Sequence, residues 1–179
     1  MRRPLAVLVV ALVTLIATCA ASGRVTDDIT VAQAHELARQ YAPDILLPAK
    51  VPTGISRVFY LQVISYTPGV KSADIGMTFH GGRTAPQFQL FIWRGRLRST
   101  IVRAMTVTYR DPGAKQVTST FKAGRFGGTK VSSQSAQVIE NYVWESAGKT
   151  YALSMFVKRL GKTLNPWSKT AVIASFRAP

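Results

Sequence analysis

The strongest candidate for a binding site in this sequence consists of four arginines and a tryptophan that lie close together. They are Trp93, Arg94, Arg96, Arg98 and Arg103. Guanidinium groups bind carboxylates and phosphates through paired hydrogen bonds, and an indole ring can stack on a headgroup or a sugar. Gly95 interrupts the strand pattern here and indicates a turn or a bulge. The spacing predicts an anion-binding loop, and a solvated hairpin tip is the alternative.

Other residues that could carry chemistry do not complete a catalytic or metal site. His35 and Glu36 begin the zinc motif H-E-x-x-H, but Arg39 occupies the second ligand position and cannot bind a cation. The glycine-rich stretch Gly124–Gly128 is expected to form a turn, and anion binding by its amides is the alternative. We therefore expect no enzyme activity, no metal and no cofactor. A hydrolase that uses His80 is the remaining enzymatic alternative, although no serine lies in a G-x-S-x-G elbow.

The first residues of the chain have the three parts of a secretory signal peptide. Two arginines follow the initial methionine, an uncharged apolar run extends from Leu5 to Ala17, and small residues continue to Ser22. A permanent transmembrane helix needs about 20 apolar residues, and this run reaches that length only if the small residues are included. The pattern predicts a signal peptide over 1–22, a tether over 23–29 and a single domain over 30–179.

Cys19 is the only cysteine and lies where the apolar run ends, in the order LIATC. This segment resembles the lipobox of bacterial lipoproteins, where a diacylglyceryl group is attached to the cysteine thiol and the signal peptide is cut just before it. Thr18 stands where that motif usually has Gly, Ala or Ser. The resemblance implies a lipid anchor at the outer face of the cytoplasmic membrane or in the cell envelope. Cleavage near Ala20, with secretion, is the alternative.

Helical signals begin and end the expected domain. Thr30 and Gln33 have the spacing of a capping box, and apolar residues at helical intervals predict a helix from Val31 to Tyr41. Two prolines in the segment Ile45–Gly54 indicate an extended path against the core. Asn165 and Pro166 indicate the start of a closing helix. Its apolar side is expected to carry Trp167, Thr170, Ala171, Ala174 and Phe176.

Short segments rich in branched and aromatic residues lie between these helices and predict strands. They are Ser56–Tyr66, Asp74–Phe79, Gln87–Trp93, Val102–Arg110, Gln116–Phe121, Lys130–Ser133, Val138–Glu145 and Thr150–Val157. The last two flank a hairpin loop, and few links are long enough for a crossover helix. The predicted fold class is α+β, with an N-terminal helix, a mostly antiparallel sheet of about six to eight strands and a C-terminal helix packed on it. Trp144, Tyr151, Leu153 and Trp167 should be largely buried.

Two stretches resemble an uncharacterised domain family. One is Ile45-Leu46-Leu47-Pro48 through Pro52-Thr53-Gly54, and the other is Trp144-Glu145 with Gly148, Tyr151, Leu153 and the closing helix to Phe176. The family is found in Gram-positive exported lipoproteins and in the extracytoplasmic parts of anti-sigma-type membrane regulators. The resemblance implies an exported binding or sensing module with no known catalytic residues.

The charge of the chain points to an anionic partner. Lys and Arg number 23 against 8 Asp and Glu, and the formal net charge is +15. Such a field attracts phospholipid headgroups, wall polymers and acidic glycans, whereas nucleic acid fits the charge but not the compartment. We expect a non-enzymatic, lipid-anchored envelope protein that binds an anionic component through residues 94–103. A carrier of a lipid or another apolar ligand is the alternative, and an apolar cavity between sheet and helices would favour it.

Overall fold

The computed structural model describes residues 28–61, 73–82, 87–108, 115–134, 137–159 and 162–178. The predicted signal peptide, Cys19 and residues 23–27 of the predicted tether lie outside these ranges. No helix in the part of the chain that is described is long and apolar enough to cross a membrane.

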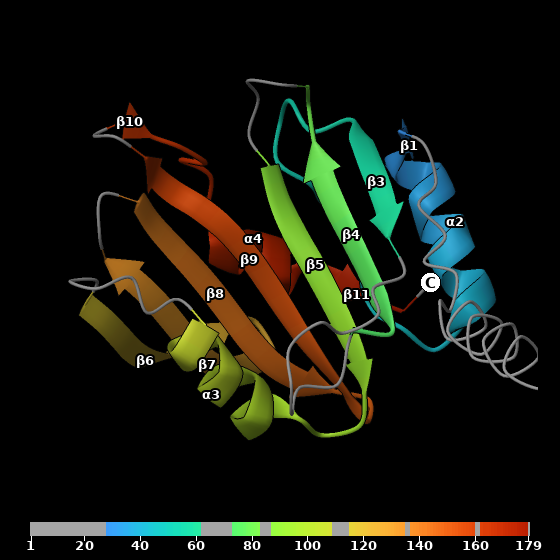
Figure 1. The fold of residues 1–179 in the computed structure, drawn as a ribbon. Helices are drawn as coiled ribbons and strands as arrows, with labels where there is room; N and C mark the ends of the chain where they lie inside the picture. Colours follow the sequence, from blue (N-terminus) through green and yellow to red (C-terminus); the bar gives the residue numbers. More distant parts are fainter. Residues whose placement is uncertain are drawn as a thin grey trace, which may run out of the picture.

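One antiparallel sheet extends through the domain (Figure 1). Its strand order is β1-β3-β4-β5-β9-β8-β7-β6, and β10 pairs with β9 outside this path. The bounds are β1 Ile29–Thr30, β3 Arg57–Leu61, β4 Ile75–His80, β5 Gln87–Arg94, β6 Lys115–Ala123, β7 Phe126–Gln134, β8 Gln137–Ser146, β9 Lys149–Arg159 and β10 Lys162–Thr163. The α+β class and the mostly antiparallel sheet are confirmed. The sheet has nine strands because the two-residue strands β1 and β10 add to its longer members.

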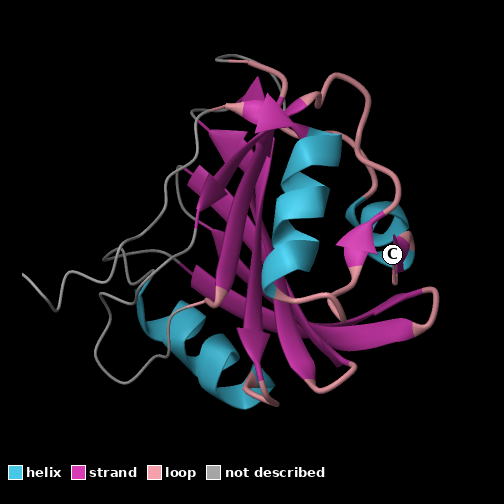
Figure 2. Ribbon diagram, turned by 90° about the vertical axis from the view of Figure 1, so that its right-hand side faces the viewer, coloured by secondary structure: helices cyan, strands magenta, loops and turns pink. Residues whose placement is uncertain are grey.

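The larger core lies on the face of the sheet that carries α2 (Val31–Tyr41), α4 (Lys169–Ala174) and the strand pair β2 (Leu47–Pro48) and β11 (Phe176–Arg177). Figure 2 shows α2 against the sheet with the short strands β2 and β11 beside it. Large side chains that are fully buried in this core include Phe79, Phe88, Leu90, Trp144, Tyr151, Leu153 and Phe176. The predicted burial of Trp144, Tyr151 and Leu153 is confirmed, whereas Trp167 is only half-buried.

A third helix, α3 (Arg98–Thr108), packs on the opposite face of the sheet against β7 and β8. The strand predicted over Val102–Arg110 is therefore wrong as far as Thr108, where the described part of this segment ends. Leu97, Ile101 and Met105 recur every four residues and pack in a small second core. The branched residues of the segment favour a strand, but burial of this helical stripe outweighs that local preference.

The start of the folded chain confirms the expected helix and moves the domain boundary. The Thr30 hydroxyl accepts from the Gln33 backbone N–H at 3.2 Å, and the Gln33 side chain accepts from the Thr30 backbone N–H at 3.0 Å. This capping box begins α2 at Val31, as the spacing predicts. Ile29 pairs with Val58 of β3, so the sheet already begins inside the predicted tether.

The chain after α2 follows the expected extended path, and the C-terminal segment holds it there. Leu47 and Pro48 pair with Arg177 and Phe176, and the Ala49 N–H donates to the Ser175 carbonyl at 3.2 Å. The two prolines prevent a helix in this connector. Because one backbone pairing joins the connector to the end of the chain, both segments cover the same core.

The closing helix begins later than predicted, and the residues that it buries are not the predicted ones. Ser168, not Asn165, is the N-cap, and its hydroxyl accepts from the Ala171 N–H at 3.2 Å. Val172 and Ile173 are the buried residues of α4. Thr170, Ala171 and Ala174, which were expected on the apolar side, are exposed, and Phe176 belongs to β11.

Asn165 instead fills a gap in the sheet. Asn165 is 3% exposed and has a φ of 52°. The side-chain Nδ2 donates to the carbonyls of Gln87 in β5 and Phe156 in β9 at 2.9 and 2.7 Å, and Oδ1 accepts from the Gln87 N–H at 3.0 Å. The pairing of β5 with β9 extends only as far as Gln89 and Ser154. The amide therefore replaces a ladder hydrogen-bond partner where the two strands separate.

Candidate functional site

Three of the predicted arginines lie at the junction of β5 and α3: Arg94 ends β5, Arg96 lies in the link, and Arg98 begins α3. We call residues 94–98 the arginine loop. The backbone N–H of Arg94 donates to Oδ2 of Asp74 at 2.6 Å, and the N–H of Arg98 donates to Oε1 of Glu145 at 3.0 Å. The two nearby carboxylates thus bind backbone rather than guanidinium groups. Among the described residues, no carboxylate lies within ion-pair distance of Arg94, Arg96 or Arg98.

The middle of the arginine loop is fixed by Thr150 in β9. Its hydroxyl accepts from the Leu97 N–H at 2.7 Å and donates to the Gly95 carbonyl at 2.8 Å. The Gly95 N–H donates to the Gly148 carbonyl at 2.9 Å. Gly95 has a φ of 90°, a conformation that side chains rarely adopt. The loop is therefore held from the adjoining hairpin, and its arginine side chains are exposed.

Trp93 is part of the second core and not of an exposed site. Trp93 is 6% exposed and lies in one cluster with Ile101 of α3, Val143 and Ala152. The prediction that Trp93 stacks on a ligand is wrong for this arrangement. Consecutive side chains of a strand point to opposite faces, so Arg94 lies on the face that Trp93 does not share.

The structure separates Arg103 from the other arginines. Arg98 and Arg103 are both exposed residues of α3. Five residues correspond to about 140° around a helix axis, so these two side chains leave α3 in different directions. The predicted set therefore divides into Arg94, Arg96 and Arg98 at the arginine loop and Arg103 on the outer side of α3.

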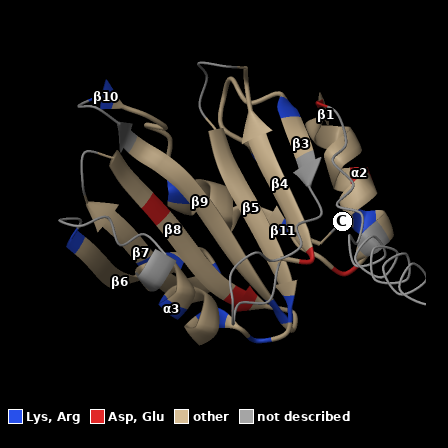
Figure 3. Cartoon of the chain, in the orientation of Figure 1, with Lys and Arg blue, Asp and Glu red and all other residues tan. Residues whose placement is uncertain are grey.

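A lysine that the sequence analysis did not include joins the arginine loop. The hairpin turn at Ala147 and Gly148 has φ values of 50° and 70°, typical of a two-residue turn, and it places Lys149 directly opposite Arg94. Figure 3 shows Lys and Arg positions gathered where β5 ends. Lys149 meets Arg94 only through the pairing of β5 with β9, which neighbouring residues do not encode.

Lys149 and Arg94 both line a hollow of about 270 Å³ whose apolar lining includes Ile45, Ile75 and Ile92. Lys149 is 7% exposed, and its ammonium group pairs with Asp44. The hydrogen bond from Lys149 lowers the pKa of the Asp44 carboxyl below its usual value. Asp74, whose carboxylate accepts from the Arg94 backbone N–H, also lines this hollow, so two carboxylates lie near its two cations.

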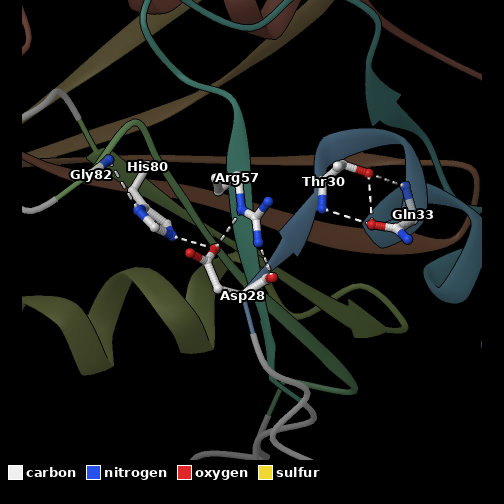
Figure 4. A network of polar contacts seen from close by, with 6 residues as sticks. All are labelled: Asp28, Thr30, Gln33, Arg57, His80 and Gly82. Carbon is white, nitrogen blue, oxygen red and sulfur yellow. Dashed lines mark hydrogen bonds and ion pairs between the residues drawn. The ribbon is translucent and has the colours of Figure 1, made fainter.

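His80 belongs to a network at the other edge of the sheet (Figure 4). Its Nδ1 lies 3.2 Å from the Gly82 N–H, which can only donate, so the ring proton is on Nε2 and points to Oδ1 of Asp28 at 3.0 Å. The Asp28 carboxylate also pairs with Nε of Arg57 at 3.3 Å, and the Phe59 ring stacks on His80. Both ring nitrogens of His80 therefore have partners within the protein.

The remaining motifs have structural positions. Gly124 and Arg125 form the turn between β6 and β7, and Gly128 lies in β7, where an added Cβ would be 2.1 Å from the Val143 carbonyl oxygen. Glu36 pairs with Arg39 on the surface of α2 at 3.6 Å. Within the described ranges, no group of three or more His, Cys, Asp or Glu residues could hold a metal ion.

Comparisons with models of protein families, with curated proteins and with solved structures find no match. The resemblance to an exported domain family therefore remains a prediction.

Proposed function

We propose that this protein is a non-enzymatic binding protein of the cell envelope that attaches to anionic groups through the arginine loop. One observation carries the proposal. The loop backbone is fixed by Asp74, Thr150 and Glu145, while its three guanidinium groups are exposed and lack a described carboxylate partner. Fixing the backbone in advance reduces the ordering cost of binding.

The partner that fits this loop best is an extended anionic surface, such as a membrane with acidic phospholipids. Each basic side chain near such a surface contributes about 1 kcal/mol, so three of them contribute about 3 kcal/mol, or about a hundredfold in affinity. No single contact of this kind holds a small ligand tightly, because exposed charges are screened by salt. An acidic wall polymer or glycan offers the same repeated charges.

The predicted lipid anchor on Cys19 would act together with this loop. A single acyl chain holds a protein to a membrane weakly, and stable attachment needs a second signal. A diacylglyceryl group supplies strong attachment by itself, and the arginine loop would then orient the domain on the acidic surface. Without the anchor, the loop alone would give reversible and salt-sensitive binding.

Vesicle binding tests the proposal with matched charge changes. The test variant is Arg94→Gln, Arg96→Gln, Arg98→Gln, and the control is Lys115→Gln, Lys122→Gln, Lys162→Gln, which removes three exposed charges elsewhere on the sheet. Cosedimentation with vesicles of phosphatidylglycerol and phosphatidylcholine should fall at least about tenfold in the arginine variant and at most about threefold in the control. Equal losses would leave only the net charge as the cause, and unchanged binding of the arginine variant would refute the role of the loop.

Two other functions have less support. An apolar carrier needs a hydrophobic cavity between the sheet and the helices, whereas the hollow at Lys149 contains charged side chains. A hydrolase that depends on His80 needs a free ring nitrogen, whereas Asp28 and Gly82 occupy both nitrogens. Anion binding is the function for which the exposed loop supplies suitable groups.

A further inference from the structure

A second and larger hollow lies between α2 and the chain segments that pair at β2 and β11. We call it the strap groove, and its volume is about 740 Å³, within the roughly 300–1,000 Å³ of small-molecule sites. Figure 2 shows α2 and this strand pair next to each other. The groove shares no lining residue with the arginine loop or with the hollow at Lys149. Its lining includes Val31, Leu47, Pro48, Val51, His35, Arg39 and Arg177.

The charged wall of the strap groove has a net charge of one. Arg39 is offset by Glu36, its ion-pair partner at 3.6 Å. Arg177 is exposed, and no carboxylate of a described residue lies within ion-pair distance of it. His35 adds no charge at neutral pH, because burial and the nearby Arg39 lower its pKa to about 4. Arg177 therefore has no counter-charge among the described residues.

Arg39 also has a donor without an acceptor. Its Nε is buried, and no hydrogen-bond partner for it exists among the described residues. An arginine N–H is a donor at every physiological pH, and a buried donor without an acceptor costs free energy. An anionic oxygen at this wall would supply an acceptor after a small rotation of the side chain, and it would also neutralise Arg177.

We infer that the strap groove binds a single-chain amphiphile with a monoanionic head, namely a fatty carboxylate. The apolar wall of Val31, Leu47 and Val51 takes the acyl chain, and Arg39 and Arg177 hold the carboxylate. A phosphate monoester carries up to two charges and would exceed the single uncompensated cation. The inference does not depend on the proposed function, since different residues carry it.

Calorimetric titration of the purified protein tests the class of ligand. The probes are dodecanoate below its micelle concentration, dodecanol, acetate and dodecyl phosphate. Dodecanoate should bind saturably with one site, dodecanol and dodecyl phosphate at least about fivefold more weakly, and acetate not measurably. Absence of saturable dodecanoate binding would overturn the inference. Dodecanol or dodecyl phosphate binding as tightly as dodecanoate would overturn the assignment of a monoanionic head.

Three variants test the location. Arg177→Gln should weaken dodecanoate about five- to tenfold and leave dodecanol unchanged, because it removes one charge-assisted contact. Lys50→Gln removes an exposed charge from the connector after β2, at a residue that does not line the groove. It should change dodecanoate affinity less than about twofold. Ala32→Trp, at an exposed residue of the lining, should block both ligands by filling the groove.

Thermal melting confirms that each variant is folded, since all three positions are exposed. Equal effects of Arg177→Gln and Lys50→Gln on dodecanoate would contradict a local contact. Undiminished dodecanoate binding by a folded Ala32→Trp variant would place the ligand elsewhere. Loss of vesicle binding in the arginine-loop triple variant, with dodecanoate binding retained, would show that the two sites are separate.

Discussion

Two regions of the sheet bring carboxylates close to arginines and use them in opposite ways. At the N-terminal edge, Asp28 binds the side chains of both Arg57 and His80. At the arginine loop, Asp74 and Glu145 bind backbone N–H groups. The edge therefore has its charges compensated within the protein, whereas the loop has a fixed backbone and guanidinium groups with no carboxylate partner among the described residues.

The difference shows that nearness of acidic and basic residues does not decide whether a charge is available. The partner of the carboxylate decides it. A carboxylate that binds a guanidinium removes a cation from the surface, while one that binds an amide stabilises the conformation that presents the cation. Substitutions in the two regions should therefore differ in their effects on folding stability and on vesicle binding.

Thr150→Val should remove the support of the arginine loop while its charges stay in place. Thr150 is 0% exposed, and valine would leave the Leu97 N–H and the Gly95 carbonyl without their partners. We expect a loss of about 2–4 kcal/mol in the free energy of unfolding, measured by urea denaturation. Thr118→Val on the exposed side of β6 is the control and should cost less than about 1 kcal/mol. Similar costs for the two variants would contradict a supporting role of Thr150.

Asp28→Asn should break the edge network and leave the loop intact. Arg57 and His80 lose their shared anion, which should lower the free energy of unfolding by about 1 kcal/mol, because the pairs are partly exposed. Vesicle binding should stay within about twofold of the wild type, although the net charge rises by one. A large gain in vesicle binding would mean that total charge matters more than position.

Glu145→Gln makes the same change in net charge at the loop. The amide oxygen still accepts from the Arg98 N–H, so the free energy of unfolding should change by less than about 0.5 kcal/mol. Vesicle binding should rise about threefold, because the negative charge next to the arginine loop is gone. Equal vesicle binding by Glu145→Gln and Asp28→Asn would remove the distinction between the two regions.

His35 is a basic group that is uncharged at neutral pH, unlike the arginines of the two regions. Burial and Arg39 lower its pKa from 6.5 to about 4, so the unfolded chain binds a proton between these values that the folded chain does not. Folding stability should therefore fall as the pH falls from about 6.5 to about 4. His35→Gln should make the melting temperature less dependent on pH in this window. Identical pH profiles of the variant and the wild type would contradict the lowered pKa.

Local patterns predicted much of the fold. The capping box of Thr30 and Gln33 placed α2, and segments rich in branched and aromatic residues predicted the strands β4, β5, β8 and β9. The pattern failed at α3, where branched residues favour a strand and only packing against β7 and β8 selects a helix. It also failed at Asn165, whose role depends on strands that separate far away in the sequence.

The candidate site could also be predicted only where its residues are neighbours in the sequence. The close spacing of the arginines identified the loop, because spacing is a local signal in the sequence. The burial of Trp93 depends on which face α3 covers, and the pairing of Lys149 with Asp44 joins residues 105 positions apart. Neither relation is encoded in neighbouring residues, so sequence reasoning could not choose between the two faces of β5.

The position of β9 determines when the sheet can close. This strand is the last long strand of the chain, yet it lies between β5 and β8 and joins the two halves of the sheet. A chain delivered from its N-terminus, from a ribosome or through a channel, holds β3, β4 and β5 with an unpaired edge until β9 follows. Pairing across such a sequence separation is slow. The sheet therefore stays open until nearly all of the domain has been delivered, and the unpaired edge of β5 is exposed to edge-to-edge aggregation during that interval.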